Sequence, residues 1–316
     1  MDPTHPQIYE VPPYLRVHKD GTVERYAGIA VVPPGIDPHT NVISKDITII
    51  PETGVTARLY SPNNSTSEKL PLIVYFHGGA YCIASSSDPV YHNSLNKLVA
   101  EANIIAISVN YRLAPEHPLP AAYDDSWEAV QWIASHAAEN GEENDYESWL
   151  KEKVDFNKVF LAGDSAGANI GNYIALKDHN FNFKILGLIM VNPYFWGKEP
   201  IGEETSDDLK RRMVDRWWEL VCPSDKGNDD PLINPFVEEA PRLEGLGVEK
   251  VLVTVCEKDI LIERGKLYHN KLVNSGWKGT AELYEIQGKD HVFHIFNPEC
   301  DKAKSLIKRI AVFINE

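Results

Sequence analysis

The clearest pattern in the chain is a series of short, uninterrupted apolar runs separated by longer segments of mixed polarity. Such runs are typical of strands buried on both faces of a parallel sheet. They lie at residues 72–76, 104–109, 158–162, 185–191 and 251–255, and a further strand is expected at 280–286. Helices are expected at residues 90–102, 121–138, 168–176, 263–275 and 299–314. This alternation predicts an α/β fold with a mostly parallel central sheet and helices on both faces.

The N-terminal part of the chain has a different pattern, in which polar and apolar positions alternate as in antiparallel hairpins. The paired segments are 14–18 with 22–25 and 46–50 with 55–60. The first pair flanks Asp20-Gly21, a dipeptide that supplies the positive φ angles of a tight turn. Residues 1–13 are rich in proline and are expected to be irregular, and residues 27–42 are expected to cross the molecule as a Pro/Gly-rich segment.

One region interrupts the alternation of strands and helices. Residues 194–247 lie between two predicted sheet strands and are too long for a simple crossover. They include a charged helix expected at 206–221, which carries Met213, Trp217 and Trp218. An insertion of this kind is well placed to form a lid. Its tryptophans either pack in the core or line a pocket, and the pattern favours neither.

Composition limits the classes of partner. The 316 residues carry a formal net charge of -15, which argues against nucleic acid, anionic membranes and highly anionic substrates. No secretory signal and no apolar run long enough to span a bilayer are visible. The four cysteines are far apart and lack metal-ligand or disulfide spacing. They are typical of a reducing compartment, so we expect a cytoplasmic protein. The sequence makes no prediction about oligomeric state.

The candidate nucleophile lies in the pentapeptide Gly-Asp-Ser-Ala-Gly at 163–167. A predicted strand precedes it and a predicted helix follows it. In this context the serine sits on a sharp turn with its hydroxyl exposed, and the glycines allow the strand and helix to approach closely. The pattern arises by chance in roughly one chain in ten of this length, so it needs support from the rest of the sequence.

A serine hydrolase also needs backbone N–H donors for the oxyanion. His77-Gly78-Gly79-Ala80 directly follows the strand at 72–76, and its glycines free backbone N–H groups to point into a site. The N–H of Ala166, next to the candidate nucleophile, is the remaining expected donor. We expect His77 to brace this loop and not to transfer protons. A glycine-rich strand end without a catalytic role is the alternative.

The acid and the base should follow Ser165 in that order. Asp259 lies at the carboxyl end of the strand at 251–255, although Glu257 and Glu263 are local competitors. The base should lie on the loop after the next strand, where both His291 and His294 occur. We favour His291 because it lies in the polar part of that loop.

These residues belong to a wider set of motifs, through which the chain from about Tyr14 to its C-terminus resembles plant carboxylesterases of the hormone-sensitive-lipase-like branch of the α/β-hydrolase fold. The motifs are Lys-Asp-Gly-Thr-Val-Glu-Arg at 19–25, His-Gly-Gly-Ala-Tyr-Cys at 77–82, Tyr-Arg-Leu-Ala-Pro-Glu at 111–116, Pro-Ala-Ala-Tyr-Asp-Asp at 120–125, the pentapeptide at 163–167 and Asn-Pro-Tyr-Phe at 192–195.

The resemblance implies that Ser165 is the nucleophile, Asp259 the acid and His291 the base of a serine esterase. It also implies one catalytic domain spanning 1–316, with a cap formed by residues 1–25 and 194–247. No metal or organic cofactor is expected, and the expected partner is a small ester. Side chains expected to line the substrate pocket are Tyr81, Phe195, Met213, Trp217 and Trp218.

Two other kinds of protein in the same branch indicate alternative functions. Some members are dehydratases or cyclases of isoflavonoid or alkaloid metabolism, and the segment 193–202 resembles 2-hydroxyisoflavanone dehydratases in particular. Others are gibberellin receptors that have lost the catalytic histidine, which is retained here as His291.

One departure is Ala80, where many members have a third glycine. We expect activity to survive this change, since the donor is a backbone N–H, and substrate choice to shift.

Overall fold

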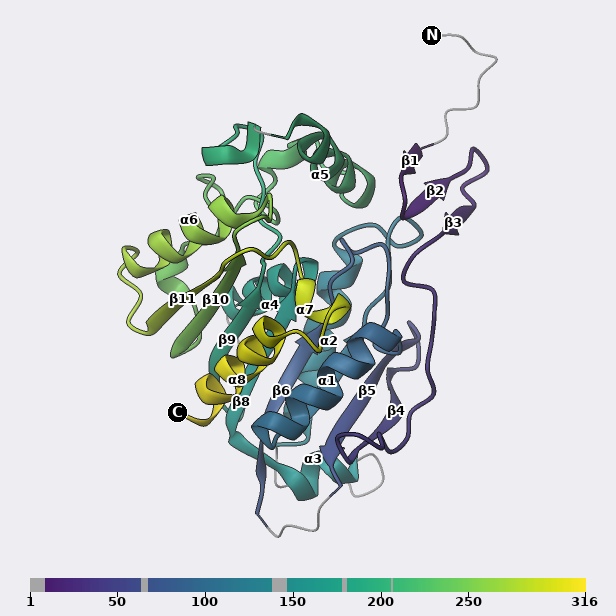
Figure 1. Ribbon diagram of the computed structural model, residues 1–316, viewed down its shortest axis with the longest axis vertical. Coiled ribbons are helices and arrows are strands. Elements are labelled where there is room, and N and C mark those ends of the chain that lie inside the picture. The colour runs from purple at the N-terminus through teal and green to yellow at the C-terminus, as the bar shows by residue number, and fades with distance from the viewer. Residues whose placement is uncertain (1–8, 64–67, 138–146, 178–180, 206) are drawn as a thin grey trace.

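The computed structural model describes residues 9–63, 68–137, 147–177, 181–205 and 207–316. Its centre is an eight-stranded sheet with the strand order β11-β10-β9-β8-β6-β7-β5-β4 (Figure 1). The strands are β4 (Val42–Ile50), β5 (Val55–Pro62), β6 (Leu70–Phe76), β7 (Ile105–Asn110), β8 (Val154–Asp164), β9 (Ile185–Val191), β10 (Lys250–Cys256) and β11 (Thr280–Ile286). Near one edge, β5 pairs antiparallel with both β4 and β7, and the other described pairs of this sheet are parallel. The mostly parallel sheet predicted from the apolar runs is therefore confirmed.

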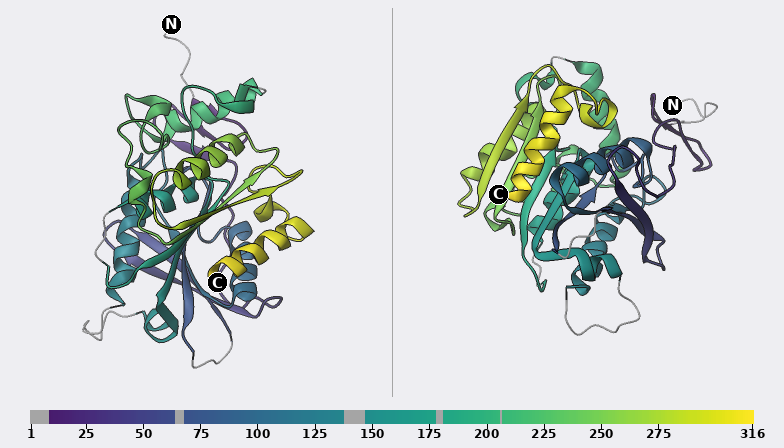
Figure 2. Two further views of the ribbon diagram at one scale, coloured as in Figure 1. Left: turned by 90° about the vertical axis from the view of Figure 1, so that its left-hand side faces the viewer. Right: turned by 60° about the horizontal axis from the view of Figure 1, so that its bottom comes forward.

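Helices cover both faces of this sheet, as predicted (Figure 2). One face carries α1 (Pro89–Ala102) and α8 (Asp301–Asn315), and the other carries α2 (Ala121–Ser135), α4 (Ala166–Leu176) and α6 (Ile262–Val273). Two large clusters of buried apolar side chains fill the spaces between the sheet and the helices. This arrangement brings the carboxyl ends of the parallel strands together at one edge, where an α/β fold builds its site.

The N-terminal segment forms a separate antiparallel sheet of β1 (Tyr9–Val11), β2 (Leu15–Val17) and β3 (Val23–Arg25). The hairpin predicted around Gly21 is confirmed, and this glycine has a φ of 84°. The prediction that residues 1–13 are irregular was wrong for β1, which is held by pairing with β2. Residues 1–8 lie outside the described part of the chain.

The insertion after β9 contains α5 (Asp208–Val221), which lies at the same end of the molecule as β1–β3 (Figure 1). The rings of Tyr14 and Trp217 lie 5.5 Å apart, so the two segments touch. The helix was expected from residue 206, which is not described, and it starts after Asp207, whose carboxylate accepts a hydrogen bond from the Lys210 N–H at 3.0 Å.

Some boundaries and short elements differ from the sequence prediction. The helix expected over 121–138 ends at Ser135, and residue 138 lies outside the described chain. Two short helices, α3 (Ser148–Lys153) and α7 (Phe293–Phe296), were not predicted. No helix among the described residues has both the length and the apolar character needed to cross a membrane.

Candidate active site

Ser165 occupies a sharp turn between β8 and α4. Its φ and ψ are 52° and -118°, a conformation that L-residues other than glycine rarely adopt. The flanking glycines are required, because a Cβ on Gly163 would collide with the backbone of Gly167 and a Cβ on Gly167 with the carbonyl of Phe76. The predicted reason for these glycines, close approach of strand and helix, is confirmed. Such backbone strain, of order 1–3 kcal/mol, is typical of functional sites.

Two hydrogen bonds link the predicted catalytic residues Ser165, His291 and Asp259 in series. His291 follows β11, and its Nε2 lies 2.9 Å from the Ser165 Oγ. Its Nδ1 lies 2.7 Å from Oδ2 of Asp259, which follows β10. With the proton on Nδ1, the imidazole donates to the carboxylate and accepts from the serine hydroxyl. The three residues come from the carboxyl ends of three different strands.

Two further donors fix the orientation of Asp259. The Asn192 side-chain amide donates to its Oδ2 at 2.8 Å, and the Leu261 N–H donates to its Oδ1 at 3.0 Å. Asp259 is buried, so these bonds replace the water that its carboxylate would otherwise bind. Both carboxylate oxygens are therefore held in place for the bond to His291.

The competing acids and the competing histidine lie elsewhere. The Glu257 carboxylate accepts a hydrogen bond from the Gly288 N–H at 2.5 Å, and the Glu263 side chain lies against Gly202. His294 is buried, and its Nδ1 has no partner among the described residues. Burial lowers the pKa of His294 to about 4, so this imidazole is neutral at physiological pH.

The pKa of His291 responds to opposing effects. Burial lowers it, but the Asp259 carboxylate, through its charge and hydrogen bond, raises it, and Asp164 and Asp290 add to the increase. The net result is a pKa above the usual value of 6.5. A raised pKa strengthens the imidazole as a base and stabilises the imidazolium that forms when it accepts a proton.

The loop after β6 is folded in an unusual way. Gly79, Ala80 and Tyr81 have φ values of 100°, 49° and 61°. The Gly78 N–H already donates to the Tyr91 hydroxyl at 2.9 Å and to the Asp164 carboxylate at 3.1 Å. In contrast, the N–H groups of Gly79, Ala80 and Ala166 donate no hydrogen bond to any other residue that the structure describes.

His77 lies beneath this loop. Its ring stacks on Tyr111 with centroids 4.3 Å apart, and its Nδ1 lies 2.8 Å from the Gly78 carbonyl. The side chain is buried, which lowers its pKa to about 4. A buried, neutral imidazole that contacts the loop backbone is suited to bracing the loop.

The side chains predicted to line a pocket are mostly buried. Tyr81, Phe195, Trp217 and Trp218 are buried, and Met213 is half-buried. Tyr81 packs against the edge of Trp218, with ring centroids 6.3 Å apart, and its hydroxyl lies 2.9 Å from that of Tyr123. Phe195 instead stacks on Tyr268 at 4.8 Å. The structure thus groups Tyr81 with Trp218, and the lining of a pocket stays a prediction.

Two residues at the site, Asn192 and Asp164, were not predicted from the sequence. Asn192 follows β9, and the rule that located Asp259, a polar side chain at the carboxyl end of a buried strand, also applies to it. Asp164 was given no role beyond its place in the pentapeptide at 163–167. A carboxylate at the end of an apolar strand was the available signal, because such a group needs buried partners.

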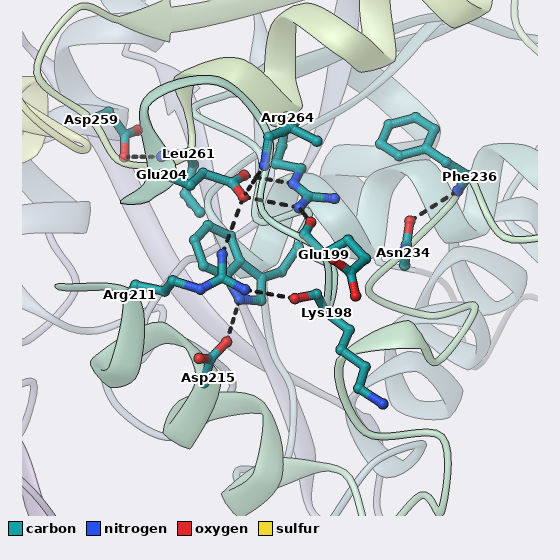
Figure 3. Close-up of polar contacts among 12 residues, drawn as sticks. Lys198, Glu199, Glu204, Arg211, Asp215, Asn234, Phe236, Asp259, Leu261 and Arg264 are labelled. Carbon is teal, nitrogen blue, oxygen red and sulfur yellow. Dashed lines mark hydrogen bonds and ion pairs between the residues drawn. The ribbon is translucent and has the colours of Figure 1, made fainter. Parts of the chain in front are cut away.

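A buried ionic cluster lies near the site and was also missed. The Glu204 carboxylate accepts hydrogen bonds from Arg264 at 2.6 and 2.9 Å and contacts Arg211 at 3.4 Å (Figure 3). We refer to Glu204, Arg211 and Arg264 as the Glu204 cluster. Both guanidinium groups lie over the Trp196 ring, at 5.3 and 5.6 Å. Since Arg264 lies on α6, five residues after Asp259, the cluster connects the insertion to the segment that carries the acid.

No group of three or more His, Cys, Asp or Glu side chains is placed to bind a metal in the described segments. All four cysteines are free thiols, and three of them are buried.

Comparison with known proteins gives consistent matches. Residues 73–295 match the model of a family described as having the α/β-hydrolase fold. A protein of Arabidopsis thaliana named probable carboxylesterase 2 is 54% identical and covers 100% of this chain and 99% of its own. The 2-hydroxyisoflavanone dehydratase of Glycyrrhiza echinata is 43% identical, over 96% of this chain and 95% of its own. The solved structure of a Pyrobaculum calidifontis esterase aligns with a TM-score of 0.71 at 26% identity, over 86% of this chain and 84% of its own.

Proposed function

The chain belongs to the α/β-hydrolase fold family, and we propose that it is a serine carboxylesterase that carries the acyl group of its substrate on Ser165. One observation carries the proposal. The Ser165 hydroxyl, the His291 imidazole and the Asp259 carboxylate form a continuous hydrogen-bonded chain at 2.9 and 2.7 Å. This arrangement activates an otherwise weak alcohol nucleophile. The named carboxylesterase relative supports the same activity.

In the acylation half of the reaction, the Ser165 Oγ attacks the ester carbonyl while His291 Nε2 takes the hydroxyl proton. Asp259 holds the ring with its proton on Nδ1 and offsets the charge of the imidazolium. His291 then gives the proton to the alcohol as it leaves. The remaining acyl group is bonded to Ser165. In the second half, His291 takes a proton from water as the water oxygen attacks the acyl carbon, and His291 then returns this proton to the Ser165 Oγ as the carboxylic acid leaves.

Each attack places a negative charge on the carbonyl oxygen, which needs hydrogen-bond donors. We assign this role to the N–H groups of Gly79, Ala80 and Ala166, because they have no other acceptor among the described residues. Gly78 shapes the same loop, but its N–H is already bonded to Tyr91 and Asp164. The four residues predicted to surround the oxyanion therefore divide into three donors and one anchor.

The proposed substrates are small to medium carboxylic esters of plant metabolites. The formal net charge of -15 disfavours strongly anionic esters. We propose that β1–β3 and residues 194–247 form a cap over the site, since both contact its loops. The Arg25 side chain donates to the Cys82 carbonyl at 2.6 Å, and Lys210 on α5 pairs with Asp290 at 3.7 Å. We place the enzyme in the cytoplasm on the evidence of its free thiols.

A dehydratase is the second candidate, because a 43% identical relative carries that name. Such an enzyme would use His291 as a base and the loop donors to hold an enolate. Ser165 would then only orient the substrate. We therefore expect Ser165→Ala to retain much of the activity toward 2-hydroxyisoflavanone if the chain is a dehydratase.

The test of the main proposal is a screen of metabolite esters in which both products are identified. An esterase releases one acid and one alcohol per turnover, and we expect Ser165→Ala to abolish this reaction. Labelling with a fluorophosphonate followed by peptide mapping should place the adduct on Ser165. The Ser165→Ala variant, which lacks the hydroxyl, should not be labelled. If Ser165→Ala retains turnover and the reaction eliminates water, the proposal of an esterase is wrong and that of a dehydratase takes its place.

A further inference from the structure

Asp164, the residue immediately before the nucleophile, is a fully buried carboxylate that the mechanism above does not use. It accepts a hydrogen bond from the Tyr75 hydroxyl on Oδ1 at 2.7 Å and one from the Tyr91 hydroxyl on Oδ2 at 2.9 Å. A third bond, at 3.1 Å, comes from the Gly78 N–H. Because all three partners donate, they favour the ionised carboxylate, although burial raises its pKa.

The bond to Gly78 connects two parts of the site that are far apart in sequence. Gly78 is the second residue after β6, and Asp164 ends β8 beside the nucleophile. The same N–H also donates to the Tyr91 hydroxyl at 2.9 Å, so Tyr91 and Asp164 hold it together. There is no room for a side chain here, since a Cβ on Gly78 would collide with the Asp164 carboxylate.

The direction of the Gly78 N–H determines where the following N–H groups point. The Gly78 N–H is turned inward to Asp164, whereas Gly79 and Ala80 have positive φ angles and N–H groups with no acceptor among the described residues. Oxyanion donors act only when they are held at hydrogen-bond distance from the position of the developing charge. A loop that could rotate at Gly78 would lose this alignment.

We propose that Asp164 is a positioning residue that anchors the loop of Gly79 and Ala80 to the Ser165 turn and so aims the oxyanion donors. The inference rests on the proposed esterase function. In this role Asp164 performs a task that the nucleophile, acid and base cannot perform. Tyr91 is the second anchor of the loop, whereas Tyr75 supports only the carboxylate.

The same carboxylate also acts on the base through its charge. The groups that face Asp164 are Tyr75, Tyr91, the Gly78 N–H and, electrostatically, His291. Those that act on His291 are Asp259, Asp164, Asp290 and the neutral His294. Removing the charge of Asp164 should therefore lower the pKa of His291, an effect that a purely structural role would not produce.

The experiment compares Asp164→Asn with the wild-type enzyme on an aryl ester and on an aliphatic trifluoromethyl ketone. In the ketone adduct the Ser165 oxygen bonds to the carbonyl carbon, the proton passes to His291, and the carbonyl oxygen becomes an anion in the donor loop. We expect kcat and ketone affinity each to fall about tenfold or more, KM to change little, and the ascending pH limb to move to lower pH.

Asp88→Asn is the matched control, since Asp88 is a buried carboxylate that caps α1, the helix of Tyr91. We expect it to leave all three readouts unchanged. If Asp164→Asn does not fold, Tyr91→Phe is tested in its place. We expect its loss of kcat and ketone affinity to be smaller than that expected for Asp164→Asn. The inference is overturned if the folded Asp164 or Tyr91 variant matches the control in kcat, ketone affinity and pH limb. Failure of the wild-type enzyme to hydrolyse any ester would instead overturn the proposed function.

Discussion

Two buried carboxylates close to the site, Asp164 and Glu204, are satisfied in opposite ways. Asp164 is held by two hydroxyl groups and one amide, which are neutral, so its negative charge is not cancelled by its hydrogen-bond partners. Glu204 is held by the guanidinium groups of Arg264 and Arg211, whose two positive charges more than offset its negative charge (Figure 3). The Asp164 charge acts on the pKa of His291, whereas the Glu204 charge is paired within its own cluster.

This difference separates catalysis from attachment of the insertion. The Asp164 region lies where β6 and β8 end, directly beside the Ser165 turn. The Glu204 cluster joins residues 198–211 to α6, and Arg264 and Arg211 also donate to the carbonyls of Glu199 and Lys198. We therefore expect changes at the catalytic end to alter rates more than stability, and changes in the cluster to do the reverse.

The largest expected effect is on rate. Ser165→Ala and His291→Ala should each lower kcat for an activated ester by about 10⁴-fold to 10⁶-fold, and the double variant should lose little more, because the residues act as one unit. Steady-state kinetics combined with thermal unfolding measures both effects. His294→Asn is the control and should retain activity. Additive losses, or a loss confined to the His294 variant, would show that the assignment of the base is wrong.

The next effect is on stability. Arg264→Met should lower the free energy of unfolding by about 3 kcal/mol, because it leaves the Glu204 carboxylate buried with a weaker partner. We expect kcat for a small ester, measured well below the unfolding temperature, to stay close to the wild-type value. The exposed pair of Arg212 and Asp208 offers a control, and Arg212→Met should cost less than about 1 kcal/mol. A large loss of kcat with unchanged stability would contradict the separation of the two regions.

A smaller effect is expected in the pH dependence. His291 must be neutral to accept a proton, so kcat/KM should rise with pH through the pKa of this residue, with a midpoint above 6.5. Asp290→Asn removes one of the charges that raise this pKa and should move the limb to lower pH. Asp301→Asn, in the first turn of α8, should leave the limb in place. A limb that moves to higher pH in the Asp290 variant would refute the electrostatic account.

The smallest effect concerns Ala80, which has a φ of 49°, in the left-handed region that favours glycine. The left-handed conformation costs an alanine roughly 1 kcal/mol, so Ala80→Gly relieves strain but adds freedom to the unfolded chain. We expect little change in stability and a shift in kcat/KM toward bulkier acyl groups across a series of esters. Ala84→Gly is the control, since Ala84 has a φ of 71°. An unchanged acyl preference would remove Ala80 as a specificity determinant.

The parts of the fold that could be predicted are those with a strong local pattern. Continuous apolar runs indicated the buried strands, and Asp-Gly indicated the first hairpin, because local chemistry dominates there. The strand β1 could not be predicted, since its three residues are held by pairing with β2. Likewise, α3 and α7 are too short to show a helical period, and their existence depends on the surrounding chain.

For the site, the order of Ser165, Asp259 and His291 along the chain was informative because each follows a recognisable strand. The same strand-end signal was present for Asn192 and Asp164, but nothing in the sequence marked the partners in the Glu204 cluster. Glu204 and Arg264 are 60 positions apart, and only the folded chain shows that they pair. The engagement of the Gly78 N–H was equally hidden, since it depends on the distance between two strand ends.

The most direct test of the account is detection of the acyl-enzyme. A slowly deacylating aryl ester is mixed with the enzyme, the reaction is quenched in acid during the burst, and peptides are analysed by mass spectrometry. We predict that the mass of the acyl group is added to the peptide containing Ser165, and that no adduct forms in Ser165→Ala. An adduct on another residue, or full turnover of the ester by Ser165→Ala, would contradict the account.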